Sequence, residues 1–578
     1  MTPGCLFSRP LDGGHFLATG FNPWRLIRLP AHTYTGDNLS MSTPAQTRRK
    51  QTRPWTFWGA FALTCLAALG SEGRAQTPAA PASAADSPLI IPRPKSVAWT
   101  GSRLSVDSST RLVLALGAGR LDRMAALSVQ HELHERFGLP LLPIRTATVE
   151  TTGVAIVFGE PERSAWVRRG LQAWGAHPSH RSEGYELVAG SGGAVVAGHD
   201  PAGTFYGAQT LCQMLRRDAH GVYVPGGWVD DYPTLGWRGA HLFVGDRALP
   251  FHRKLIARVF ARLKMNALVL ECEQARWETL GRAAPSWAMS KADLKAEVAF
   301  ARRYGMTVTP LVNSVGHMPW AFAGGANTDL AEDPQTPYAA RVADPRTDRF
   351  LFRLYDEVLD TFGASALHLG GDEVALRGRY PYLSRAQFPT LADAFVAQVT
   401  RAHDHLKARG VRTLLWGDML LASGEAADAA SAPSAAQARQ MRERLPHDIV
   451  LTDWHYRASG PFASLRPLRA AGFGPIIGAT WFEPGNIAGF SQALGASREK
   501  GLLQTTWAGF NSSEANLTHE KRQFTAFVLA AECAWNGGGV DAGRLPYDPA
   551  QVFDRLYGPR TPAPPAPKPP KLGGRRAL

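Results

Sequence analysis

The sequence contains little cysteine for its length, with 5 cysteines among 578 residues. Cys5 and Cys65 fall in segments that we expect to be removed, which leaves three. Three cysteines cannot form a disulfide framework, so at most one bridge is possible and buried thiols are the expected state. These three are Cys212, Cys272 and Cys533.

The sequence also lacks a hydrophobic run long enough for a good membrane anchor. The uncharged run 55–69 has fifteen residues, whereas a spanning helix needs about 20. It follows the basic segment 48–53 and precedes Gly73-Arg74-Ala75, an order typical of a secretory signal peptide cleaved after Ala75. Because a signal begins near the N-terminus, we expect the true start at Met41. The alternative is an uncleaved helix that anchors the chain.

The body of the chain lacks the strong positive charge that the net +14 suggests. Residues 1–75 hold eight basic and three acidic side chains, and residues 560–578 hold five basic and none acidic. The remainder carries 50 basic and 46 acidic groups, so nucleic acid is not an expected partner. The segment 561–570 is a Pro-rich spacer before a basic tail, which is either a solvated terminus or a binder of an anionic envelope.

Several chemical motifs are missing. We find no Gly-x-Ser-x-Gly elbow, no phosphate-binding Gly-Lys-Ser/Thr loop and no spacing typical of zinc ligands. We therefore expect neither a metal nor a cofactor. The alternative is a metal site formed by His241, His317 and His368.

The segment 89–232 predicts a small α+β domain. Helical spacing of apolar residues appears at 121–137 and 204–217. The β-rich runs are 111–116, 154–160, 185–190 and 194–199.

From Trp237 onward a strand followed by a helix recurs eight times, which is typical of a (β/α)8 TIM barrel. The predicted fold class is therefore α/β, a (β/α)8 barrel preceded by the small α+β domain. The predicted helices are 252–264, 290–305, 346–363, 391–410, 436–445, 463–471, 489–500 and 521–536. The predicted strands are 238–244, 266–273, 307–313, 366–373, 412–419, 449–456, 475–481 and 502–509.

In such a barrel the active site lies at the carboxyl ends of the strands. The fourth predicted strand ends in two glycines followed by Asp372 and Glu373, and we expect the glycines to let a substrate approach the backbone. Strand alternation predicts that Asp372 and His368 face one side and that Glu373 turns outward. Four tryptophans at strand ends suit the apolar face of a sugar or an acetyl group. They are Trp416, Trp454, Trp481 and Trp507.

The segment 368–374, HLGGDEV, resembles the His-x-Gly-Gly-Asp-Glu signature of glycoside hydrolase family 20, the β-N-acetylhexosaminidases. Segments 89–99 and 198–215 resemble the beginning and the end of that family's non-catalytic N-terminal domain. Segment 230–239 resembles its entry to the first barrel strand. The resemblance extends through most of the chain after the expected leader.

The resemblance implies that Glu373 is the general acid/base and that Asp372 orients the substrate's 2-acetamido group. The carbonyl oxygen of that group would be the nucleophile, an exception to the scheme with two protein carboxylates. Independently of the family, adjacent side chains on one strand cannot stand on both sides of a glycosidic bond, so a nucleophile from the substrate resolves the geometry.

The resemblance also implies binding roles for other residues. Trp416 and Trp507 resemble walls of the family's acetamido pocket. Arg238 is expected to grip ring hydroxyls, and His317 to support the carboxylates unless it is an ordinary buried histidine.

The sequence departs from the usual family pattern in three places. Asn313 replaces an acid before Gly-His, the segment 268–277 replaces a His-Leu-Thr-Asp motif, and Gly509 replaces an acid after the last strand. The branch called hexosaminidase D shares these departures. They leave open how the sugar's 4- and 6-hydroxyls are held. The candidate replacements, or else structural carboxylates, are Glu271, Glu273 and Asp418.

We therefore expect an exported enzyme, periplasmic or extracellular, that removes terminal non-reducing N-acetylhexosamine from oligosaccharides or glycoconjugates. No stable membrane span is expected. The alternative is an amino-sugar receptor without turnover. The expected segments are an upstream extension (1–40), the signal peptide (41–75), a linker (76–88), the α+β domain (89–232), the barrel (233–545) and a C-terminal segment (546–578).

Overall fold

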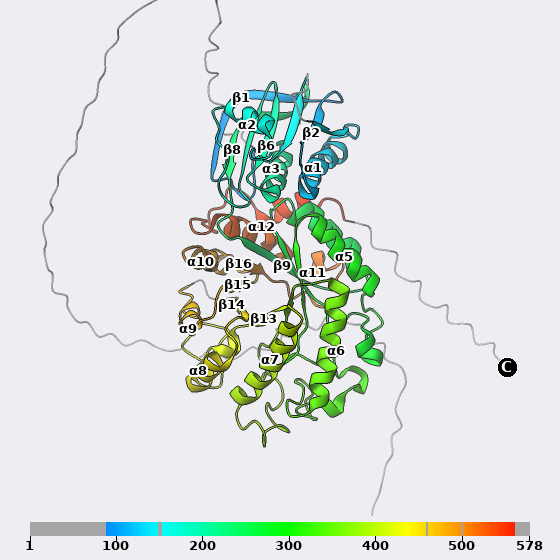
Figure 1. Ribbon diagram of the computed structural model, residues 1–578, viewed down its shortest axis with the longest axis vertical. Coiled ribbons are helices and arrows are strands. Elements are labelled where there is room, and N and C mark those ends of the chain that lie inside the picture. Colours follow the sequence, from blue (N-terminus) through cyan, green and yellow to red (C-terminus); the bar gives the residue numbers. More distant parts are fainter. Residues whose placement is uncertain (1–87, 148–152, 458–459, 498, 500, 561–578) are drawn as a thin grey trace, which may run out of the picture. The chain divides into compact units, whose positions relative to one another are not determined.

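A computed structural model describes most of the chain after the expected leader (Figure 1). The expected extension and signal peptide, nearly all of the linker, and the Pro-rich tail lie outside the described residues, so these remain predictions. The described residues are 88–147, 153–457, 460–497, 499 and 501–560.

The N-terminal domain is an eight-stranded mixed sheet with helices on both faces. Along β2, Leu112 and Leu114 face α1 (Arg120–Phe137) and α3 (Pro201–Met214), whereas Val113 faces α2 (Ala165–Gln172). The sheet order is β1 (Ser96–Val106), β8 (Gly221–Asp231), β5 (Tyr185–Gly190), β6 (Gly193–Gly198), β4 (Ala155–Gly159), β2 (Arg111–Ala115) and β3 (Ile144–Ala147), with β7 (Arg216–Asp218) beside β8.

This domain confirms the predicted α+β class and adds elements that the sequence pattern did not indicate. Strands β1, β3, β7 and β8 and helix α2 were not predicted. In β1 the reason is exposure, because most of its residues are in contact with solvent and carry no apolar run.

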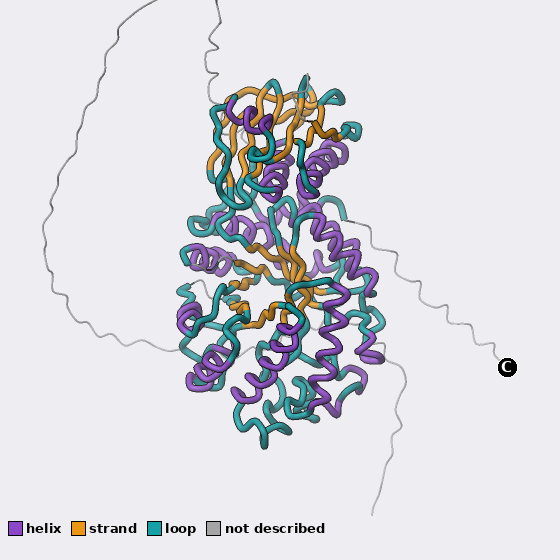
Figure 2. The backbone as a smooth tube through the Cα atoms, viewed as in Figure 1, coloured by secondary structure: helices purple, strands orange, loops and turns teal. Residues whose placement is uncertain are grey.

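The second domain is a closed barrel of eight parallel strands, which confirms the predicted TIM barrel. In Figure 2 its strands lie inside a surrounding set of helices. The strands are β9 (Trp237–Phe243), β10 (Ala267–Glu271), β11 (Thr307–Leu311), β12 (Ala366–His368), β13 (Arg412–Trp416), β14 (Val450–Trp454), β15 (Ile477–Thr480) and β16 (Gly501–Gln504).

The eight predicted helices of this domain are all present, apart from shifts at their ends, and α11 and α13 were not predicted. The largest shift is in α10, which begins five residues early because Pro484 starts the helix. The helices are α4 (Ala248–Lys254) with a π-helical continuation η3 (Leu255–Phe260), α5 (Lys291–Arg303), α6 (Pro345–Phe362), α7 (Leu391–Ala408), α8 (Ala435–Arg444), α9 (Leu465–Ala470), α10 (Pro484–Gly495), α11 (Asn516–His519), α12 (Lys521–Asn536) and α13 (Pro549–Tyr557). Short 3₁₀ turns are η4 (Glu278–Ala283), η5 (Ala323–Gly325), η6 (Thr328–Leu330) and η7 (Asp418–Leu420).

A buried ion pair joins the two domains. Lys264 of the barrel is fully buried, and its Nζ lies 2.8 Å from Oδ2 of Asp231 and 2.8 Å from the hydroxyl of Tyr185. Trp535 of α12 donates its indole N–H to Oδ1 of Asp231 at 2.7 Å. Breaking a buried pair of this kind typically costs about 3–5 kcal/mol, so the α+β domain is a structural partner of the barrel.

Cys212, Cys272 and Cys533 are buried and free, as expected. Among the described residues, no helix combines the length and the apolar character that crossing a membrane requires.

Candidate active site at the carboxyl ends of the barrel strands

The turn after β12 carries the two adjacent carboxylates. The strand ends at His368, and the backbone then becomes left-handed at Gly370 (φ 68°), Gly371 (φ 86°) and Glu373 (φ 46°). The predicted alternation is therefore wrong, because Asp372 and Glu373 are not part of a strand. The turn aims both carboxylates in one direction.

The two glycines serve this turn and its packing. A Cβ on Gly370 would lie 2.1 Å from Oδ1 of Asn313, and one on Gly371 would lie 2.6 Å from Cδ1 of Leu415. No other residue type fits without displacing these neighbours. The expectation that the glycines admit a substrate to the backbone is therefore wrong, since protein atoms already fill that space.

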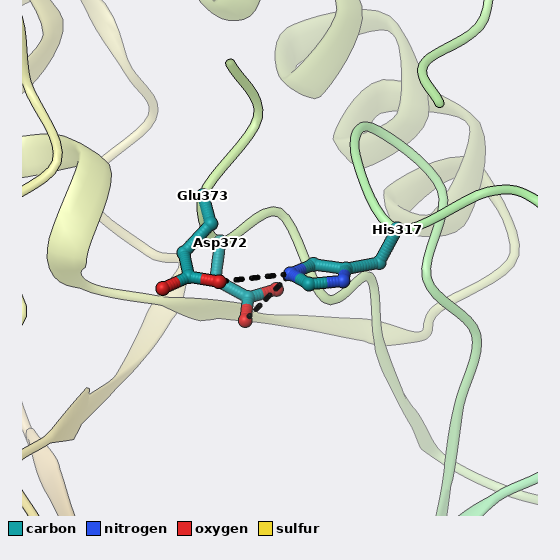
Figure 3. Close-up of side chains that lie close together, drawn as sticks. All are labelled: His317, Asp372 and Glu373. Atoms are coloured by element: carbon teal, nitrogen blue, oxygen red, sulfur yellow. Dashed lines mark ion pairs between the residues drawn. The ribbon is translucent and has the colours of Figure 1, made fainter. Parts of the chain in front are cut away.

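Asp372 and Glu373 lie side by side and both face one ring nitrogen of His317 (Figure 3). Its Nε2 is 3.5 Å from Oδ2 of Asp372 and 3.4 Å from Oε2 of Glu373. The exposed fraction of the side chain is 24% for His317, 15% for Asp372 and 12% for Glu373, so a ligand can still reach all three. The ring of Tyr338 packs edge-on against His317 with centroids 5.1 Å apart, and its buried hydroxyl has no hydrogen-bond partner among the described residues.

Burial and mutual attraction set the charges of this group. Burial raises the pKa of Asp372 to about 6, although the neighbouring His317 opposes the shift. Burial lowers the pKa of His317, but Asp372 and Glu373 outweigh it and raise the pKa to about 9. At neutral pH the site therefore holds a histidinium beside an ionised aspartate.

Asp418 holds the backbone of Glu373 in position. Its Oδ2 accepts the backbone N–H of Glu373 at 3.0 Å, and the residue is 1% exposed. Burial, together with the charge of Asp372, raises the pKa of Asp418 to about 7. The predicted contact of Asp418 with a sugar hydroxyl is not supported, because the carboxyl group is buried and fixes the position of Glu373.

Glu271 is also buried, at 4% exposure. Its Oε1 accepts a hydrogen bond from Nδ2 of Asn313 at 3.0 Å, and its Oε2 lies 3.1 Å from Nε2 of His241. Glu273 is 1% exposed and receives the second N–H of the same amide at 3.0 Å. Protein groups bind both oxygens of Glu271, and the side chain of Glu273 is buried. The prediction that Glu271 or Glu273 binds sugar hydroxyls is therefore wrong.

Arg238 was misplaced by the sequence interpretation. It is the second residue of strand β9, at the opposite end of the barrel from the two carboxylates. Its guanidinium is 1% exposed, lies 2.7 Å from Glu183 of the N-terminal domain and donates to the carbonyl oxygen of Lys264. Arg238 therefore joins the domains and does not contact a substrate.

His368 is fully buried and has both ring nitrogens engaged, by the hydroxyl of Thr452 at 3.0 Å and the N–H of Gly370 at 3.0 Å. The predicted substrate contact is wrong, and so is the three-histidine metal site, because the nitrogens of His241 are engaged as well. Ligand atoms of His317, Asp372 and Glu373 lie within 4.8 Å of one another, a spacing that a cation can also bridge.

The predicted tryptophans do gather, around Tyr456 just beyond the end of β14. Its ring centroid lies 4.8 Å from that of Trp454, 5.7 Å from Trp481 and 6.3 Å from Trp507. Trp416 lies 6.3 Å from Trp507 and is almost fully buried, so it forms the base of this aromatic wall. Trp481 and Trp507 are partly exposed. Their contact with a substrate remains a prediction.

Sequence reasoning missed Tyr456 and Tyr338. Tyr456 lies two residues after Trp454, so the alternation of an extended chain could have placed both side chains on one side. Tyr338 lies far along the loop after β11, and nothing in the local pattern indicates that it returns to His317.

A charged network holds Tyr456 in place. Nδ1 of His455 lies 2.6 Å from Oδ1 of Asp428, and Nε2 lies 2.8 Å from the hydroxyl of Ser464 and 3.4 Å from Asp453. The other oxygen of Asp428 accepts the backbone N–H of Tyr456 at 2.9 Å. Burial lowers the pKa of His455, but the two aspartates outweigh it and raise the pKa to about 9.

This network predicts a loss of stability at alkaline pH. A histidine whose pKa rises on folding from 6.5 to about 9 contributes fully below 6.5 and loses its contribution as the pH rises through 9. Asp428→Asn is expected to lower the free energy of unfolding by about 3–5 kcal/mol at pH 6 and to flatten its decline toward pH 9. Calorimetry across this range measures both, with the exposed Asp541→Asn as control. A pH slope unchanged in Asp428→Asn would contradict the assignment.

Two models of one family match the chain. Residues 87–232 match glycosyl hydrolase family 20, domain 2, and residues 264–459 match the glycosyl hydrolase family 20 catalytic domain. Together the matches cover more than half of the chain, and the second includes the turn with the two carboxylates.

Curated relatives are similar over parts of their length. A lacto-N-biosidase of Bifidobacterium bifidum is 28% identical over 251 residues, which are 41% of this chain and 22% of the relative. A β-hexosaminidase of Porphyromonas gingivalis is 23% identical over 77% of this chain and 60% of the relative. The chain thus spans less than two thirds of the length of either.

Solved structures confirm the fold. A β-N-acetylhexosaminidase of Bacteroides fragilis has a TM-score of 0.58 at 18% identity, covering 78% of this chain and 92% of that one. A mutant Streptomyces plicatus β-hexosaminidase in complex with its product GlcNAc has a TM-score of 0.59 at 18% identity, covering 82% and 96%.

Proposed function

Because the chain belongs to glycosyl hydrolase family 20, we propose that it is an exo-acting β-N-acetylhexosaminidase. The proposed substrates are oligosaccharides or glycoconjugates with a terminal non-reducing N-acetylglucosamine, N-acetylgalactosamine or both. The observation that carries the proposal is the convergence of Asp372 and Glu373 on one nitrogen of His317.

The convergence of Asp372 and Glu373 also supports a particular mechanism. In the two-carboxylate schemes the groups stand on opposite sides of the anomeric carbon, about 5–5.5 Å apart in retaining enzymes and about 6.5–9.5 Å apart in inverting ones. Here oxygens of Asp372 and Glu373 lie within 4.8 Å of each other and contact the same imidazole. This arrangement supports a nucleophile that comes from the substrate rather than from the protein.

In the proposed reaction, Glu373 donates a proton to the glycosidic oxygen as the bond from this oxygen to C1 breaks. The carbonyl oxygen of the 2-acetamido group forms a bond to C1, which gives an oxazolinium ion and frees the alcohol. The carboxylate of Asp372 holds the acetamido N–H and stabilises the positive charge. Glu373 then takes a proton from the water that attacks C1. The bond from C1 to the acetamido oxygen breaks in this step, which restores the acetamide, and the sugar leaves with retained configuration.

The aromatic wall supports the same assignment. Trp507 and Trp481 are held by one amide, since Oε1 of Gln523 accepts the backbone N–H of Trp507 at 2.5 Å and the indole N–H of Trp481 at 2.8 Å. Fixed rings of this kind suit an acetyl methyl group and a sugar face. An intramolecular nucleophile held in place reaches effective molarities of about 10⁵–10⁸ M.

Three chromogenic substrates test the proposal. The 4-nitrophenyl β-glycosides of N-acetylglucosamine and N-acetylgalactosamine should release nitrophenol, whereas the plain β-glucoside should react at least about 10³-fold more slowly because it lacks the acetamido nucleophile. No release from either amino sugar by folded protein would favour the receptor without turnover. Comparable rates on the β-glucoside would point to a nucleophile in the protein.

The acid side of the pH profile is a separate prediction. Asp372 has to be ionised to stabilise the oxazolinium ion, and its pKa in the free protein is about 6. We expect kcat/KM to fall as the pH drops through 6, since kcat/KM reports groups of the free enzyme. Asp372→Asn should remove this limb together with most of the activity. A constant kcat/KM down to pH 4 would contradict the assignment.

We also propose export to the periplasm or the exterior, on the strength of the leader-like segment 41–75. N-terminal sequencing of the mature protein tests it, and the expected first residue is Gln76.

A further inference from the structure

A chain of buried polar groups lies behind the two carboxylates, across the carboxyl ends of three neighbouring strands. It consists of His241 on β9, Glu271 at the end of β10, Glu273 just beyond it, and Asn313 after β11. The exposed fractions are between 0% and 6%, and the proposed mechanism uses none of these groups. Carboxyl groups buried this deeply have to be neutral or paired.

The hydrogen bonds of His241 show where its protons are. Nδ1 lies 3.0 Å from the backbone carbonyl oxygen of Thr506, which can only accept, so Nδ1 carries a hydrogen. Nε2 lies 3.1 Å from Oε2 of Glu271. A hydrogen bond between those two atoms requires one proton, held either by the imidazole or by the carboxyl group.

Burial determines whether His241 or Glu271 carries this proton. It lowers the pKa of His241 to about 4 and raises the pKa of Glu271 to about 8, and Asp372 adds to the second shift. Burial and Glu271 also raise the pKa of Glu273 well above its usual range, and Oε2 of Glu273 has no partner among the described residues. At neutral pH a neutral imidazole therefore faces a protonated Glu271.

Asn313 connects these buried groups to the turn that carries Asp372 and Glu373. Its amide nitrogen Nδ2 donates one hydrogen bond to Glu271 and one to Glu273, each with a donor–acceptor distance of 3.0 Å. Its Oδ1 lies where a Cβ on Gly370 would clash with it. The next residue, Ser314, donates its backbone N–H to the carbonyl oxygen of Leu369 at 2.9 Å. Asn313 is therefore packed between the buried acids and the turn that carries Asp372 and Glu373.

We propose that Glu271 is a positioning residue that acts as a neutral carboxylic acid, donating its proton to His241 and, through Asn313, holding the turn that carries Asp372 and Glu373. This inference rests on the proposed hydrolase function. Removing the proton places a carboxylate against the lone pair of Nε2 and adds a negative charge near Asp372 and His317. Both effects loosen the turn, so activity should decline as Glu271 ionises.

The decisive variant is Glu271→Gln. Glutamine reproduces the protonated acid, because its N–H can donate to His241 and its oxygen can accept from Asn313, but it does not ionise. We expect kcat at pH 7 to stay within about twofold of wild type. We also expect the part of the alkaline limb that the ionisation of Glu271 causes to be lost. Glu271→Met removes both hydrogen bonds and should lower kcat by about tenfold or more with little change in KM.

A matched control and a measurement without substrate complete the test. Glu297→Gln alters another buried pair, in which Oε1 of Glu297 lies 2.7 Å from Nδ1 of His252, and should leave the alkaline limb in place. Nitrogen NMR of histidine-labelled protein, assigned with His241→Gln, should show His241 neutral with its proton on Nδ1 at pH 7. This measurement remains valid even if the hydrolase proposal fails.

Two results would overturn the inference. One is an imidazolium signal for His241 at pH 7, which would mean that Glu271 is ionised. The other is a folded Glu271→Gln variant as impaired at pH 7 as Glu271→Met, which would mean that the negative charge of Glu271 is what the site needs.

Discussion

Glu373→Gln is expected to abolish nearly all hydrolysis of substrates whose leaving group is another sugar. The leaving alcohol of such a substrate is a poor leaving group unless it is protonated as the bond breaks, and the glutamine amide cannot supply that proton. A positioned general acid contributes about 10²–10⁴-fold, so kcat should fall within this range. With 4-nitrophenol, which leaves without a proton, the loss in the first step should be much smaller. Comparing kcat for chitobiose and for the nitrophenyl glycoside measures this difference.

Glu162→Gln is the matched control, since Glu162 is an exposed carboxylate on the N-terminal domain. Its activity should equal that of wild type. If Glu373→Gln lost the same factor on both substrates, Glu373 would not be acting as the proton donor to the leaving group. Equal thermal melting of the variant and the wild type would show that the loss is chemical.

Asp372→Asn is expected to lower kcat by about 10²–10³-fold, the usual cost of losing one preorganised electrostatic contact to a developing charge. The asparagine keeps the shape of the side chain but lacks the negative charge that stabilises the oxazolinium nitrogen. Binding should be largely retained, because the aromatic wall is unchanged. The split is measured by kcat from initial rates and by the affinity for the product N-acetylglucosamine from calorimetry.

The control for this variant is Asp404→Asn, which changes an exposed aspartate on α7. Near-normal turnover by Asp372→Asn would exclude the acetamido mechanism. An equal effect on N-acetylglucosaminide and on plain glucoside would also exclude it, since only the first substrate carries the group that Asp372 is proposed to hold.

The barrel could be predicted because each βα unit carries a local signal, an apolar run followed by helical spacing. The rule that active sites lie at the carboxyl ends of the strands then pointed to the turn with Asp372 and Glu373. The same rule argues against Arg238, which lies at the amino end of its strand, and the structure pairs it with Glu183 of the N-terminal domain. A motif match that disregards the direction of the strand therefore put this arginine on the wrong face of the barrel.

The roles of the other polar residues could not be predicted, because burial depends on neighbours from distant segments. Glu271 and Asp418 stand at strand ends, where a sugar hydroxyl was a reasonable partner. In the structure Glu271 instead forms hydrogen bonds with Asn313 and His241, and Asp418 accepts a hydrogen bond from the backbone of Glu373. Each of these partners lies between 30 and 45 residues away in sequence, so no local pattern reveals the pairing.

The sequence by itself determined the two domains, the eight βα repeats and the pair of carboxylates, since these follow from hydrophobic periodicity and from adjacent residues. The tertiary structure decided which way the carboxylates face and what charge they carry. Two left-handed glycines turn Asp372 and Glu373 toward His317, a residue more than fifty positions earlier in the chain. Burial among other acids then shifts the pKa values, and burial is a property of the folded chain alone.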